Sequence, residues 1–149
     1  MEAITAFLES FDIAKLLPEL GKFISDLRFW AGLFMLIGPI VMLGLGIWYF
    51  FLPTKEANHY IGFRTHASMG SIQAWRYSQR LAGLLYMIVG GVFGALSLVL
   101  IIVLSFTQPM AMATTAFIVI ILQAFSAIAL WAILQMMISS RFDKNGNPK

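Results

Sequence analysis

The stretch LAGLLYMIVGGVFGALSLVLIIVLSF, residues 81–106, contains no charged side chain and is almost entirely apolar. About 30 Å of hydrocarbon needs roughly 20 helical residues at 1.5 Å each, so a run of this length predicts a transmembrane helix. Two further charge-free runs, residues 29–52 and 110–139, meet the same condition. The sequence therefore predicts an all-α membrane protein whose membrane domain, residues 29–139, contains three transmembrane helices.

Composition supports this class and excludes others. Of the 149 residues, 60% are hydrophobic and only 11% are charged, whereas a soluble domain carries about 25% charged residues. The chain has no cysteine, which rules out a disulfide framework, a thiol nucleophile and a thiolate metal site. A net charge of +3 is too small to indicate direct nucleic-acid binding.

The distribution of charge predicts an orientation. Residues 53–80 join the first two spans, and this loop and the polar tail 140–149 both carry more bases than acids, whereas the connection at 107–109 is uncharged. The bases are Lys55, Arg64, Arg76 and Arg80 in the loop, and Arg141, Lys144 and Lys149 in the tail. Basic segments stay on the cytoplasmic side. We therefore expect a cytoplasmic loop and C-terminus, with the N-terminus outside.

The N-terminal segment, residues 1–28, has apolar side chains at helical spacing interrupted by charged ones. Pro18 lacks an amide hydrogen and disfavours helical geometry in the preceding residue. We expect two short amphipathic interfacial helices broken near residues 15–18. Their apolar face can rest on lipid or on a protein surface, and the sequence favours neither.

Small and polar residues inside the spans predict helix packing. Gly90 and Gly94 form a small-xxx-small step, which lets two helices approach closely in lipid, within the protein or in a homo-oligomer. Gln123 and Ser126 share a helical face, and an amide in hydrocarbon favours an interhelical hydrogen bond of about 1 kcal/mol. The alternative is a polar track for a permeant.

The loop segment NHYIGFRTHASMGSIQAWRYSQR, residues 58–80, is polar, basic and rich in aromatic residues. Gly62 suits a sharp turn, and Ser71 is a plausible N-cap for a helix that continues into the second span. Arg64 can donate two parallel hydrogen bonds, either to cap the end of a span or to bind a ligand or lipid headgroup. His59 and His66 have only Glu56 nearby, so we expect no metal and no cofactor.

This loop resembles the signature of the SdpI family of bacterial integral membrane proteins. The matching residues are Asn58, Gly62, Phe63, Arg64, Thr65, Ser68, Ser71, Trp75 and Arg80. The chain departs from the family pattern at His66, Gln73 and Gln79. The resemblance implies a bacterial inner-membrane protein that gives immunity to a secreted antimicrobial peptide, with a linked signalling role toward a cytoplasmic regulator.

These features are consistent with two functions. In the first, a non-enzymatic immunity protein meets a peptide toxin through residues 1–28 and 107–109, while the loop meets the lipid bilayer or a regulator protein. In the second, the chain is a small oligomeric channel or transporter subunit. Catalysis is not expected, because Asp26, Glu56 and Asp143 lie on separate segments and no serine has a histidine–acid pattern around it.

Overall fold

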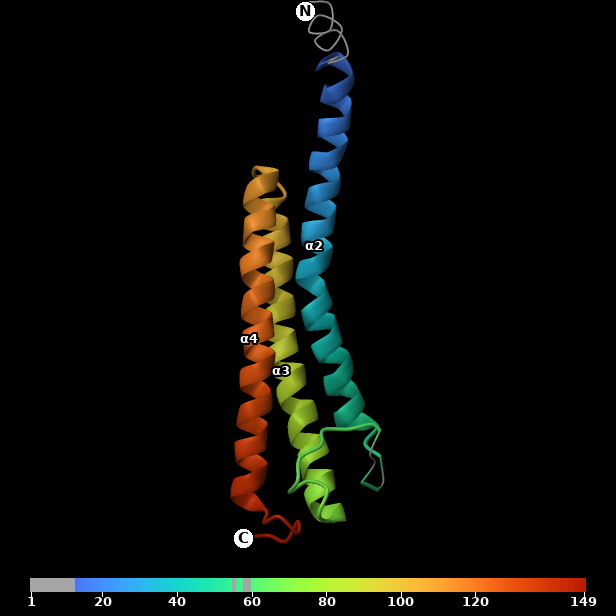
Figure 1. Cartoon of the computed structure of the whole chain (residues 1–149), viewed down its shortest axis with the longest axis vertical. Coiled ribbons are helices and arrows are strands. Elements are labelled where there is room, and N and C mark those ends of the chain that lie inside the picture. The colour runs from blue at the N-terminus through green and yellow to red at the C-terminus, as the bar shows by residue number, and fades with distance from the viewer. Residues whose placement is uncertain (1–12, 55, 58–59) are drawn as a thin grey trace, which may run out of the picture.

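A computed structural model describes residues 13–54, 56–57 and 60–149, apart from the side chains of residues 13–17 and 24–25. Three long helices run side by side: α2 (Ile13–Phe51), α3 (Ile72–Leu104) and α4 (Pro109–Arg141). Helices α3 and α4 form a hairpin, α2 lies against it, and the α2–α3 loop and the C-terminus lie at the same end (Figure 1). We call this the loop end and the opposite one the hairpin end.

All three helices are long and apolar enough to cross a membrane. The prediction of an all-α membrane protein with three spans is therefore confirmed. Helix α3 starts well before Leu81, and its 33 residues correspond to about 50 Å. Since the hydrocarbon core is only about 30 Å thick, the polar first turns of α3 extend beyond it.

The expected break near residues 15–18 is wrong. Helix α2 begins at Ile13 and continues through Pro18 into the first span, so the described part of the N-terminal segment extends the span axis. Pro18 stands in the second turn, where it removes one hydrogen bond close to the helix end. This part projects beyond the α3–α4 hairpin (Figure 1), and Leu20 and Phe23 are exposed. Residues 1–12 lie outside the described residues.

Helices α2 and α3 approach most closely where glycines face each other. A Cβ on Gly83 would lie 2.6 Å from the backbone nitrogen of Phe50, and one on Gly46 would lie 2.7 Å from that of Met87. Further along α3, a Cβ on Gly90 would lie 2.9 Å from Met42. Gly94 faces the same helix at ordinary van der Waals distance. The close contact between α2 and α3 therefore includes Gly83, which the small-xxx-small pattern does not single out.

In the middle of the bundle, one backbone carbonyl of α2 is bonded by side chains of the other two helices. Pro39 has no amide hydrogen, so the carbonyl of Met35, four residues earlier, loses its helical partner. The Gln123 side-chain amide donates to this oxygen at 3.0 Å, and the Ser97 hydroxyl donates to it at 3.1 Å. An unbonded carbonyl in hydrocarbon would cost several kcal/mol. Gln123 thus serves helix packing.

The hairpin end is held by a polar contact and a small apolar cluster. The Arg28 guanidinium donates to the backbone carbonyl of Thr107 in the α3–α4 turn. Beneath it, the buried cluster contains Ala31, Met35, Met112, Ala116 and Val119. This end is tied to α2 mainly through packing, whereas the loop end has an extensive polar framework.

The Met35 carbonyl predicts a coupled effect of two substitutions. Gln123→Leu should destabilise the protein by about 1 kcal/mol, because it removes a donor to that carbonyl. Pro39→Ala restores an amide hydrogen four residues after Met35, so in that background the cost of Gln123→Leu should fall to near zero. Unfolding by dodecyl sulfate in mixed micelles measures both costs. Equal costs in the two backgrounds would contradict this account.

Candidate functional site

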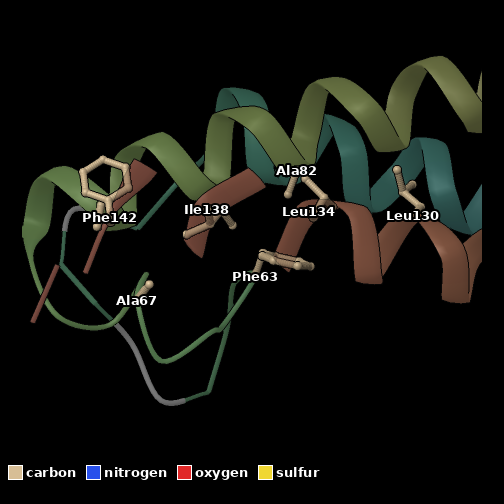
Figure 2. Packing of buried hydrophobic residues seen from close by; sticks show 8 residues of the cluster. Phe63, Ala67, Ala82, Leu130, Leu134, Ile138 and Phe142 are labelled. Carbon is tan, nitrogen blue, oxygen red and sulfur yellow. The ribbon is translucent and has the colours of Figure 1, made fainter. Parts of the chain in front are cut away.

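The described part of the signature loop, residues 53–54, 56–57 and 60–80, packs across the loop end of the bundle. Phe63 is buried in the larger apolar cluster, which joins the loop to α3, α4 and the tail. Figure 2 shows Phe63 next to Leu134 of α4, with Ala67 of the loop beneath Ile138 and with Phe142 over the first turns of α3. The loop is therefore part of the folded core and not a free connection.

Gly62 packs closely against Trp75. Gly62 has φ +123°, a conformation that L side chains rarely adopt. A Cβ there would lie 2.6 Å from the indole ring of Trp75, whose side chain is fully buried. The indole N–H donates to the carbonyl of Thr54 at 3.0 Å, which ties the start of the loop to α3. Only glycine fits this position.

Gln79 bonds both backbone groups of Phe63. Its side-chain oxygen accepts the Phe63 N–H at 2.9 Å, and its side-chain nitrogen donates to the Phe63 carbonyl at 2.9 Å. Gln79 is only 1% exposed, so these bonds are shielded from water. The side-chain amide thereby bonds the Phe63 backbone as a neighbouring β-strand would. These bonds fix the position of the loop along α3.

Thr65 and Ser68 close a turn on themselves. The Thr65 N–H donates to the Ser68 hydroxyl at 2.7 Å, and the Ser68 N–H donates to the Thr65 hydroxyl at 3.0 Å. The Ser68 hydroxyl also donates to the Thr65 carbonyl at 3.0 Å. Both side chains are buried, which leaves their hydroxyls engaged in holding the loop rather than available for chemistry.

Ser71 links the loop, α3 and the C-terminal tail (residues 142–149). Its hydroxyl accepts the Ala74 N–H at 3.1 Å as an N-cap and donates to the Gly146 carbonyl at 2.6 Å. Gly146 and Gly70 approach so closely that a Cβ on either would overlap the opposite backbone. The tail is thus packed onto the loop.

The tail is held in shape by Phe142 and Asp143. Phe142 is buried, with its ring 5.5 Å from that of Tyr77. The Asp143 carboxylate accepts the N–H groups of Asn147 at 2.7 Å and Asn145 at 2.9 Å. These bonds favour the charged form, so the pKa of Asp143 is lowered, with Asn147 as the largest cause. The Asp143 carboxylate therefore stays charged at neutral pH and keeps its hydrogen bonds in the turn.

Arg64 and Arg80 are the exposed residues among the signature residues that the structure describes. Arg64 lines a surface pocket of about 620 Å³, which we call the loop pocket. Its other walls come from the loop and from α4; they are Thr65, His66, Met69, Trp131 and Gln135. A guanidinium beside an exposed aromatic face suits binding of an anionic or carboxylate-bearing group.

The structure separates the remaining predicted residues. Arg80 lies at a different pocket on α3, and Gln123 lies in the middle of the bundle. Ser126 borders an apolar groove between α3 and α4, away from Gln123's bonds. Asn58 and His59 lie outside the described residues. Within the part of the chain that the structure describes, no three His, Asp or Glu side chains gather as a metal site.

The sequence pattern does not point to two residues that hold the loop, Gln79 and Phe142. Gln79 departs from the family pattern, yet it bonds the loop backbone. Its signal was helical spacing, because Trp75, Gln79 and Gly83 lie on one face of α3 and all are buried. The tail is polar in sequence, and its one aromatic residue, Phe142, is buried.

The Gly62–Trp75 contact predicts a large effect of a small substitution. Gly62→Ala should destabilise the protein by about 2 kcal/mol or more, because the methyl group meets both the indole ring and an unfavourable φ. Gly91→Ala is the matched control, since a Cβ there meets nothing within 4 Å. Denaturant titration with hydrogen exchange over residues 60–80 measures both. Equal stability of the two variants would contradict the contact.

Comparison with known proteins gives a family. The model of the SdpI/YfhL protein family matches residues 54–138, which is more than half of the chain. This match covers most of the signature loop, all of α3 and nearly all of α4. Searches of curated proteins and of solved structures gave no match. The chain is therefore a multi-pass membrane protein that belongs to the SdpI/YfhL family.

Proposed function

We propose that this protein protects a bacterial inner membrane against a secreted antimicrobial peptide and relays the peptide's presence to a cytoplasmic regulator. The family membership supports a protein of the SdpI type. The observation that carries the proposal further is the exposed guanidinium of Arg64, which lines the loop pocket on a loop that its buried residues hold in place.

The geometry favours binding over catalysis. His66 is the one ordinary acid–base group among the residues that line the loop pocket, and the pocket has no carboxylate partner for it. The nearby hydroxyls of Thr65 and Ser68 are engaged in the turn. A rigid rim with one exposed guanidinium can recognise a carboxylate of a partner protein without reacting with it. We therefore propose a non-enzymatic role.

The charges of the loop end support a cytoplasmic placement of the loop and tail. Arg64, Arg76, Arg80, Arg141, Lys144 and Lys149 are all exposed there. Basic residues next to spans are retained inside. The N-terminus would then lie outside, with the projecting part of α2 and its exposed Leu20 and Phe23 placed where an amphipathic peptide arrives. The loop pocket would face a cytoplasmic regulator.

Labelling of single cysteines tests this orientation, and the chain offers a clean background because it has no cysteine. Gln108→Cys lies in the exposed α3–α4 turn and should react with an impermeant maleimide in intact cells. Tyr60→Cys, at a position that is 89% exposed, should react only after the membrane is opened. The reverse pattern would overturn the orientation, and with it the assignment of the loop pocket to the cytoplasm.

The role of Arg64 is tested in cells challenged with membrane-active peptides. Deletion of the gene should raise sensitivity to at least one peptide. Cells that carry Arg64→Ala should be at least about tenfold more sensitive to that peptide than cells with the wild-type protein, because the pocket loses its anion-binding group. Lys144→Ala, which removes an exposed cation from the tail, should protect normally. Hydrogen exchange over residues 60–80 checks that the loop of each variant stays folded. Unchanged sensitivity of the deletion strain would contradict the immunity role. Full protection by the Arg64→Ala variant would contradict the proposed role of Arg64 in binding.

A further inference from the structure

A second pocket lies at the loop end. It is on the face of the first α3 turns opposite to Trp75 and Gln79, which contact the signature loop. It has a volume of about 450 Å³ and lies between the end of α2 and the start of α3. Arg76 and Arg80 contribute its cationic side, one helical turn apart and both exposed. Phe50, Leu81 and Leu84 contribute its apolar side. We call it the arginine pocket.

The arginine pocket straddles the boundary of the hydrocarbon. The charge-free run of the second span begins at Leu81, directly after Arg80. Leu84 lies one turn deeper and is 43% exposed, so the apolar wall opens toward the lipid chains. Lipid phosphates sit at the depth where such a run begins. A phospholipid could therefore place its phosphate between the arginines without leaving the leaflet.

The charges around this pocket suit an anion. None of its lining residues is acidic. Tyr77 lines the pocket, and the guanidinium carbon of Arg141 lies 4.8 Å from its ring centroid, so a third cation contacts one of the lining side chains. The Asp143 carboxylate accepts hydrogen bonds within the tail turn. Two guanidinium groups one turn apart can donate several hydrogen bonds to a phosphodiester.

We propose that the arginine pocket is a binding site for an anionic glycerophospholipid, with the phosphodiester held by Arg76 and Arg80 and an acyl chain lying along Leu81 and Leu84. The combination of a cationic rim and an apolar wall at the membrane boundary distinguishes this ligand from a soluble anion, which would use only the rim. The site is separate from the loop pocket and does not depend on the proposed immunity role.

Native mass spectrometry of the delipidated full chain tests the site, with dioleoyl phosphatidylglycerol and dioleoyl phosphatidylcholine as probes. The wild-type protein should retain phosphatidylglycerol at least about tenfold more tightly than phosphatidylcholine. Arg76→Gln with Arg80→Gln should abolish this preference, since each lost charge-assisted contact is worth about a factor of ten. Arg76→Lys with Arg80→Lys keeps both charges but loses the planar donor geometry, and should weaken binding severalfold.

The matched control is Lys22→Gln with Lys144→Gln, which removes two exposed cations that do not line the pocket. This control should keep the wild-type preference. Circular dichroism checks that every variant is folded, and the lysine variant keeps the test informative if the glutamine variant is not. Equal retention of both lipids, an equal loss in the control, or displacement of the lipid by inorganic phosphate would each overturn the proposal.

Discussion

The two hydrogen bonds between the Gln79 side chain and the backbone of Phe63 are the interaction on which the loop end depends. A loop that crosses the end of a bundle has backbone groups without regular partners, and burial makes each unbonded group costly. Gln79 bonds both groups of Phe63 from within α3, and this lets the Phe63 ring enter the apolar cluster. The positions of Gly62 and Arg64 on either side then follow from the chain itself.

The same requirement organises the middle of the membrane. Pro39 frees a carbonyl in the first span, and Gln123 and Ser97 reach it from the two other helices. Because no water is available in hydrocarbon, this carbonyl specifies how the three helices sit against one another. The close glycine contacts between α2 and α3 bring those two backbones near enough for the short Ser97 side chain to reach. Polar residues inside the spans thus act as specific connections between helices.

At the loop end, the arginines are divided between two surfaces. Arg64 belongs to a pocket made with α4, whereas Arg76 and Arg80 belong to a pocket made with the end of α2. The packed tail lies near both, since Phe142 touches Tyr77 and Gly146 touches the Gly70–Ser71 segment. A change in the tail would therefore reach the first turns of α3 directly. This arrangement places the proposed protein-recognition site and the proposed lipid site on distinct faces.

The sequence alone determined the membrane class, the three spans and the Ser71 N-cap, because hydrocarbon thickness and local hydrogen bonding leave few alternatives. It also singled out Gly62, Trp75 and Arg64 through the family pattern. Only the tertiary structure decided the continuity of α2 through Pro18, the Gln79–Phe63 pairing, the burial of Phe142 and the separation of Arg64 from Arg80. These features depend on which segments distant in sequence come into contact. Local propensity and periodicity carry no information about such partners, so they became visible only once the helices were packed.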